Sequence, residues 1–121
     1  SVEVRIHVAG GQVICEQVKY IPVGSNVLIR NRRNGAFFSA KLLDSTVGPN
    51  NAVRAREIAI NTCRACALDF GAVDMALTKD GNWVVFEINS APGLSQRNDD
   101  GVEHDMPSSY AAYLAYFRSF V

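Results

Sequence analysis

The stretch that decides the fold is LDFGAVDMALTKDGNWVVFEINSAPGL, residues 68–94. Near its middle stands the pair Asp80-Gly81, which is a strong local signal for a tight turn between two strands. Extended segments flank this turn at Gly71–Thr78 and Trp83–Asn89. The stretch therefore predicts a β-hairpin, and the register of that hairpin determines which side chains lie together.

The predicted register sorts the side chains onto two faces. A two-residue turn and a symmetric four-residue loop both place Thr78 opposite Trp83 and Asp74 opposite Glu87. One face is then uniformly apolar and should pack against a helix; it consists of Val73, Met75, Leu77, Val84, Phe86 and Ile88. The other face carries polar groups and small neighbours, namely Asp74, Glu87, the diagonal Asn89, Ala72 and Ala76.

The two facing carboxylates predict a cation site. Like charges directly opposite each other destabilise a sheet, so the repulsion between Asp74 and Glu87 must be compensated. Cβ atoms about 5 Å apart suit a divalent cation, and two carboxylates with the Asn89 amide oxygen are hard ligands of the kind that Mg²⁺ prefers. The alternative is a solvated face whose acids point at water. A bulge near the turn would weaken the cation hypothesis, because it would move Asp74 away from Glu87.

Composition limits the class of protein. The chain has 121 residues, of which 48% are hydrophobic and 20% charged, and this is typical of one globular domain. Twelve basic residues balance twelve acidic ones, so we expect neither a nucleic acid nor a membrane surface as partner. The chain enters a strand pattern almost at once, without an initial Met or a signal peptide. We therefore expect a segment of a longer protein, and the three cysteines, which lack a secreted disulfide spacing, indicate the cytoplasm.

The rest of the chain predicts an α+β fold. Val2–Val8 and Gln12–Ile21 should form a hairpin about Gly10-Gly11, with Arg5 opposite Glu16 on its polar face. The expected architecture is a mostly antiparallel sheet with helices packed on one face and the ligand face open. Those helices are expected over Ala52–Leu68, with an inner stripe of small residues, and from about Pro107-Ser108 onward; residues 95–106 are polar and predict a mobile loop.

Several segments resemble one known superfamily. Residues 87–94, EINSAPGL, preceded by LDFGAVD at 68–74, resemble the closing motif of the ATP-grasp superfamily, and most closely its glutamate-ligase-like branch, which includes phage-encoded members. The segments EVRIHV with Gly10-Gly11 and RNRRNG at 30–35 are similar to two further stretches of this branch. D-alanine–D-alanine ligases have an arginine where this chain has Ala72. The resemblance implies that residues 1–121 are the C-terminal portion of an ATP-grasp domain, without its N-terminal nucleotide-covering part.

The resemblance also implies a site. Asp74, Glu87 and Asn89 would hold one or two Mg²⁺ ions, or alternatively Mn²⁺, on the phosphates of ATP. Glu87, Asn89 and Arg5 would thereby bind the nucleotide. Arg5 and Arg30 are the catalytic candidates, because a planar guanidinium suits a phosphate or a substrate carboxylate. The competing interpretations are the Arg5–Glu16 pair and, for Arg30, a solvated basic loop.

The implied function is that of a carboxylate–amine ligase. ATP would phosphorylate a carboxylate, and an amine would attack the acyl phosphate to form an amide or peptide bond. The partners would be the nucleotide, small-molecule or peptide carboxylate and amine substrates, and the remainder of the domain, with self-association of the exposed cleft face as a further option. We expect the chain alone to be inactive. The alternatives are an ATP-grasp phosphotransferase and a non-catalytic binding module that retains the fold.

Overall fold

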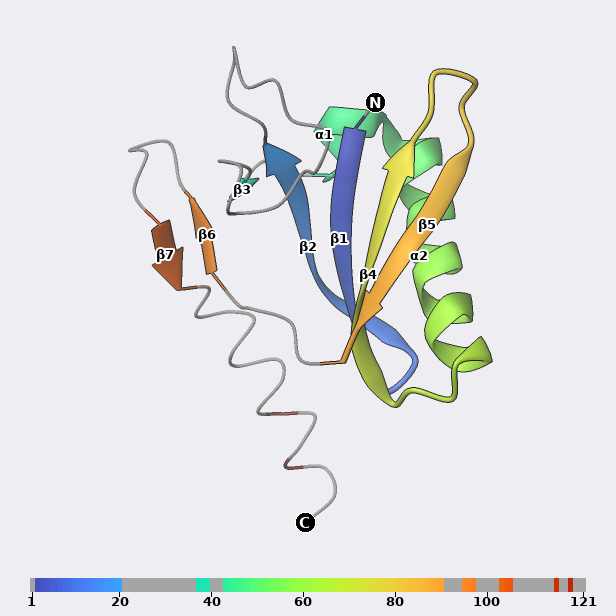
Figure 1. The fold of residues 1–121 in the computed structure, drawn as a ribbon, viewed down its shortest axis with the longest axis vertical. Helices are drawn as coiled ribbons and strands as arrows, with labels where there is room; N and C mark the ends of the chain where they lie inside the picture. Colours follow the sequence, from blue (N-terminus) through green and yellow to red (C-terminus); the bar gives the residue numbers. More distant parts are fainter. Residues whose placement is uncertain are drawn as a thin grey trace.

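The computed structural model describes residues 2–20, 37–39, 43–90, 95–97 and 103–105, together with Ala115 and Arg118. Among them, seven strands form one sheet in the order β5-β4-β1-β2-β3-β6-β7, with β5 and β7 at its two ends (Figure 1). The elements are β1 (Val2–Ala9), β2 (Gln12–Tyr20), β3 (Phe37–Ser39), α1 (Leu43–Val47), α2 (Pro49–Ala65), β4 (Phe70–Leu77), β5 (Trp83–Asn89), β6 (Ser95–Arg97) and β7 (Glu103–Asp105). All strand pairs except β3–β6 are antiparallel. The predicted α+β fold is confirmed.

The core lies between α2 and the central strands. The helix contributes small buried side chains, and the strands contribute larger ones; the set comprises Ala52, Ala55, Ala59, Cys63, Val4, Ile6, Val8, Val73 and Met75. Small helix residues let the axis of α2 come close to the sheet, so this one helix covers the apolar face of β1 and β4. Within the described ranges, no helix is both long and apolar enough to span a membrane.

The bounds of α2 differ from those predicted. The helix begins at Pro49 rather than Ala52, because proline is well tolerated in the first turn, where its missing N–H has no helical partner. It ends at Ala65 rather than Leu68, because Ala67 takes a left-handed conformation (φ 54°) and the Leu68 N–H donates to the Cys63 carbonyl oxygen at 2.9 Å. This C-terminal motif supplies hydrogen bonds to main-chain carbonyl groups that have no partner within the helix.

A bulge in β2 changes the register of the first hairpin. Val8 pairs with Val13 as predicted, but the register shifts between His7 and Val8, so that Arg5 pairs with Gln17. The predicted Arg5–Glu16 pair is therefore wrong. One extra residue in a strand turns the side chain of every residue beyond it to the opposite side of the sheet. Glu16 consequently pairs with Ile6, on the side of α2.

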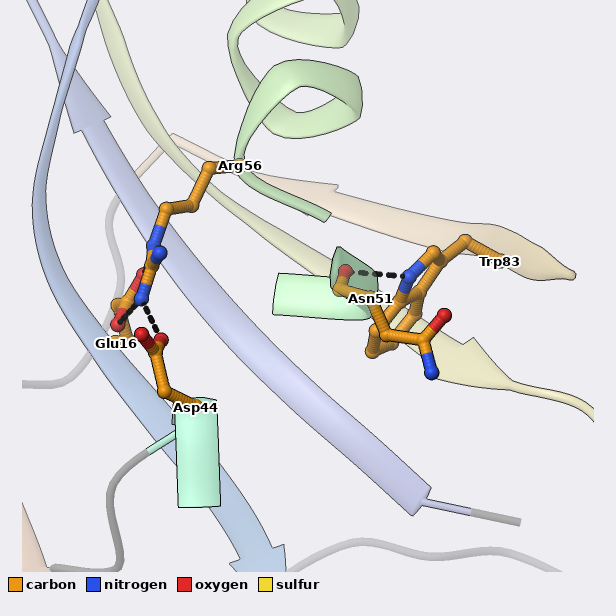
Figure 2. Close-up of polar contacts among 5 residues, drawn as sticks. All are labelled: Glu16, Asp44, Asn51, Arg56 and Trp83. Carbon is orange, nitrogen blue, oxygen red and sulfur yellow. Dashed lines mark hydrogen bonds and ion pairs between the residues drawn. The ribbon is translucent and has the colours of Figure 1, made fainter. Parts of the chain in front are cut away.

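Arg56 of α2 compensates for the acid that this bulge turns toward the helix. Its guanidinium forms two hydrogen bonds with the Glu16 carboxylate, one of them 3.0 Å long, and it also pairs with Asp44 of α1 (Figure 2). The hydrogen bond with Glu16 is the main reason why the pKa of Arg56 lies above its ordinary value. The cluster thereby ties β2, α1 and α2 together.

A second bulge lies in β5. Leu77 pairs with Trp83 around a loop of residues 78–82, so the predicted pairing of Thr78 with Trp83 is wrong. The register then shifts between Asp74 and Met75, which leaves Phe86 as the extra residue on β5. The two displacements cancel, and Asp74 faces Glu87 as predicted.

The longer loop and the bulge together make the predicted apolar face of β5 wrong at two positions. Val84 and Phe86 do not pack under α2; they are 50% and 51% exposed. Trp83 and Val85 pack against the core in their place. The Trp83 indole N–H also donates to the Asn51 carbonyl oxygen at 3.0 Å, which joins β5 to α2 (Figure 2).

The stretch 95–106 is not entirely a loop. β6 and β7 lie within it and pair antiparallel, with Gln96 opposite His104. Strand pairing uses main-chain groups, so a polar sequence can form short strands near the end of a sheet. The helix predicted from about residue 107 lies outside the described residues except for Ala115 and Arg118, which are helical and exposed.

Replacing Arg56 should destabilise the fold. Arg56→Met keeps most of the aliphatic stem but leaves Glu16 without its guanidinium on the helix side, and we expect the free energy of unfolding to fall by about 1 to 2 kcal/mol. Urea denaturation of the chain measures this. Arg64→Met, at an exposed position in the last turn of the same helix, is the matched control and should change stability by less than about 0.5 kcal/mol. Equal effects of the two substitutions would contradict the assignment.

Candidate metal and phosphate site

The sheet face opposite α2 gathers the candidate side chains in two rows. Residues directly paired on neighbouring strands point to the same side of a sheet. One row across β5, β4, β1 and β2 consists of Glu87, Asp74, Arg5 and Gln17. The adjacent row, on the same strands, consists of Asn89, Ala72, His7 and Cys15. The register thus brings Asp74, Glu87 and Asn89 to one face, with Arg5 in the same row as the two acids.

An ion pair between Arg5 and Asp74 lies at the centre of this face. The Arg5 Nε atom donates to Oδ1 of Asp74 at 2.7 Å, and Nη2 donates to Oδ2 at 3.0 Å. The side chains are only 14% and 4% exposed, so the Asp74 charge is compensated where water reaches it poorly. The sequence does not predict this partner, because β1 and β4 are far apart along the chain and no local pattern indicates their pairing.

The ion pair leaves Asp74 able to act as a ligand. A carboxylate has about four lone-pair positions, and the bidentate contact with Arg5 uses one on each oxygen. Glu87 is exposed and Asn89 is partly buried. These hard oxygen donors fit Mg²⁺, which commonly takes one or two carboxylates and completes its coordination shell with phosphate oxygens and water. The described residues contain no group of three or more His, Cys, Asp or Glu that could hold a metal, so the candidate site consists of two carboxylates and one amide.

His7 and Gln17 form a buried pair beside Arg5. Both are fully buried, and His7 Nε2 lies 2.6 Å from Gln17 Oε1. Because that oxygen can only accept, Nε2 carries the proton. Burial lowers the pKa of His7 from 6.5 to about 4; the Gln17 hydrogen bond and Asp74 oppose this shift, whereas Arg5 adds to it. The imidazole is therefore neutral at physiological pH.

The positions of Gln17 and Phe86 beside the candidate site were not predicted from the sequence either. The two bulges determine where these side chains lie, and neither bulge has a recognisable sequence signal. Phe86 directly precedes Glu87, and Val84 pairs with Ala76 on the face of Asp74, so an exposed apolar surface adjoins the polar row. Arg30, the second predicted catalytic residue, lies outside the described residues.

A family comparison covers most of the chain. The model of the family described as RimK-like ATP-grasp domain matches residues 1–108. The chain belongs to this family. The expected membership of the ATP-grasp superfamily is confirmed. None of the curated proteins compared with the chain matches it.

Solved structures of ATP-grasp ligases share the fold. The D-alanine–D-alanine ligase from Bacillus anthracis complexed with ATP has a TM-score of 0.57 at 15% identity, over 97% of this chain and 34% of that chain. The ATP-grasp ligase PsnB complexed with its minimal precursor, Mg and ADP has a TM-score of 0.52 at 18% identity, over 93% and 32%. The macrocyclase MdnC bound with precursor peptide MdnA from Microcystis aeruginosa MRC has 0.50 at 18%, over 98% and 33%. The chain spans about a third of the length of each.

The low pKa of His7 predicts a pH dependence of stability. Between pH 6.5 and about 4, unfolded His7 binds a proton that the folded residue does not, so the free energy of unfolding should fall as the pH is lowered through this window. The loss attributable to His7 is up to about 3 kcal/mol, at about 1.4 kcal/mol per pKa unit. Urea denaturation of the chain at several pH values measures it.

His7→Gln should flatten this profile, because glutamine does not titrate but still offers an N–H to Gln17. His104→Gln, which replaces the other histidine of the chain, is the control and should keep the slope of the parent. An unchanged slope in the His7→Gln variant would show that the acid sensitivity has another source.

Proposed function

We propose that the protein carrying this chain is an ATP- and Mg²⁺-dependent carboxylate–amine ligase, and that the chain supplies the metal and phosphate half of its site. A substrate carboxylate takes the terminal phosphoryl group of ATP, and an amine then attacks the acyl phosphate, forming an amide or peptide bond and releasing phosphate. The observation that carries the proposal is the row in which Glu87 faces Asp74 and Arg5 holds Asp74, in a chain of the ATP-grasp family.

Each side chain of the row has a role in this proposal. Asp74, Glu87 and Asn89 would hold one or two Mg²⁺ ions, with Mn²⁺ as an alternative. When bound, such ions neutralise charge on the transferring phosphoryl group. Arg5 adds a fixed positive charge beside these ligands, because its bidentate contact with Asp74 holds the planar guanidinium in one orientation. Arg30 is kept as a second contact on the strength of the resemblance alone.

A peptide is the substrate class that we propose. PsnB and MdnC, both similar to this chain in fold, have solved structures with the precursor peptides PsnA2 and MdnA, respectively. A peptide side-chain carboxylate would accept the phosphoryl group, and a side-chain or main-chain amine would then displace phosphate. Because the chain spans about a third of these structures, we expect residues 1–121 alone to form no amide bond.

Product analysis tests the reaction class. The full-length protein, incubated with ATP, Mg²⁺ and a peptide library rich in Asp, Glu and Lys, should release phosphate and yield products lighter than the peptides by one water, or ligated pairs. Mass spectrometry identifies these products. Phosphorylated peptides without amide products would instead indicate a phosphotransferase. Absence of ATP turnover with every carboxylate tested would favour a binding module.

Removing one ligand charge should strongly reduce turnover. Glu87→Gln is the sharper variant, because Glu87 is exposed, whereas Asp74→Asn also breaks the ion pair with Arg5. We expect Glu87→Gln to lower kcat/KM by at least about 100-fold, since metal and charge stabilisation of the phosphoryl group is lost. Asp80→Asn makes a similar change at an exposed position in the loop of the same hairpin and should retain activity within about twofold. Full activity of Glu87→Gln would refute the assignment.

The exposed ring of Phe86 should support the nucleotide. An apolar side chain beside the phosphate ligands can cover part of a base or ribose, so Phe86→Ala should raise KM for ATP by about three- to tenfold with little change in kcat. Steady-state kinetics at varied ATP concentration measures this. Val53→Ala, at a similarly exposed apolar position on α2, is the control. A fall in kcat at unchanged KM would assign Phe86 to another role.

A further inference from the structure

The two strands beside β1 give Arg5 neighbours of different charge. On β4 the neighbour is the Asp74 carboxylate, which accepts two hydrogen bonds from Arg5. On β2 the neighbour is Gln17, a neutral amide. The acid that precedes it, Glu16, is turned toward α2 by the bulge and pairs there with Arg56. No carboxylate therefore lies opposite Arg5 on the β2 side.

A buried hydrogen bond fixes the orientation of the Gln17 amide. His7 Nε2 donates to Gln17 Oε1 at 2.6 Å, and neither side chain is exposed. A buried donor or acceptor that loses its partner is costly, so this contact holds the amide oxygen toward the imidazole. The amide of Gln17 is thereby a fixed neutral group on one flank of Arg5, with the anionic Asp74 on the other flank.

We propose that Gln17, oriented by His7, is a positioning residue that keeps the Arg5 guanidinium hydrogen-bonded to Asp74. A carboxylate at position 17 would give the guanidinium a second anionic neighbour, and the two acids would compete for its planar donors. Of the two described residues paired with Arg5, a neutral amide of fixed orientation on β2 thus leaves Asp74 on β4 as the anionic one. The consequence for phosphoryl transfer rests on the proposed function, whereas the consequence for the ion pair does not.

The test replaces Gln17 by two residues of similar size, one charged and one neutral and apolar. Gln17→Glu adds a carboxylate beside Arg5, and Gln17→Met keeps the volume without charge. Gln12→Glu makes the first of these changes at an exposed position of the same strand and is the matched control. His7→Phe removes the N–H that holds Gln17, and His7→Gln restores an N–H donor. All five variants are made in the full-length protein for kinetics and in residues 1–121 for spectroscopy.

The first readout is the Arg5 Nε–H signal in ¹H–¹⁵N spectra of the chain, which reports the contact with Asp74 whether or not the protein has ligase activity. It is assigned by its loss in Arg5→Lys. We expect the signal to shift and to exchange faster with solvent in Gln17→Glu and His7→Phe, and to stay near the parent position in Gln17→Met, His7→Gln and Gln12→Glu. Well-dispersed backbone spectra show that each variant is folded.

The second readout is steady-state kinetics of the full-length protein. Gln17→Glu should lower kcat by about tenfold or more with KM for ATP nearly unchanged, since a misplaced charge acts mainly in the transition state. Gln17→Met should stay within about threefold. An Arg5 signal that is unchanged in folded Gln17→Glu and His7→Phe would overturn the proposal, even if activity falls. A shifted signal in a protein that turns over no ATP would uphold the positioning role and overturn the proposed function.

Discussion

The ion pair between Arg5 and Asp74 is the interaction on which the polar face of the sheet depends. Two carboxylates opposite each other on neighbouring strands repel, and one of them, Asp74, is nearly excluded from water. The guanidinium of Arg5 offsets this cost, because it donates to both oxygens of the buried carboxylate at 2.7 and 3.0 Å. Together with the exposed Glu87, the three groups carry one net negative charge. A divalent cation and an anionic phosphate can therefore be added to this face together without leaving a large charge unbalanced.

Two bulges determine which side chains share this face. In a strand the side-chain period is two, so one extra residue exchanges the faces of everything beyond it. In β2 the exchange brings Gln17 to Arg5, and in β5 the bulge at Phe86 brings Glu87 back to the face of Asp74, next to the exposed Val84 and Phe86. The polar row, the buried amide and the exposed aromatic ring thus follow from backbone irregularities at two positions.

Much of the architecture could be predicted from local pattern, and the failures lie where an irregular register or a pairing between distant strands decides the outcome. Strand alternation predicts the apolar side of β4, and the helical period predicts the stripe of small residues on α2, because both depend on periodicity within one element. The facing of Asp74 and Glu87 was predicted from a register that is displaced by one residue next to the loop, and it is confirmed because the bulge at Phe86 offsets that displacement. The partner of Arg5 could not be predicted, since the Arg5–Asp74 contact requires β1 to pair with β4. Neither strand has a sequence pattern that indicates this pairing.

The bulge in β2 also links the candidate site to the stability of the fold. The bulge that sets Gln17 opposite Arg5 turns the adjacent Glu16 toward α2, where a lone carboxylate at the edge of an apolar core would be unfavourable. Arg56 reaches across from α2 to that carboxylate and also meets Asp44 of α1. The cluster of Arg56, Glu16 and Asp44 on the helix side and the neutral Gln17 on the opposite face thus result from the same bulge. A regular β2 would leave Arg56 without Glu16 and would place that acid beside Arg5, in competition with Asp74.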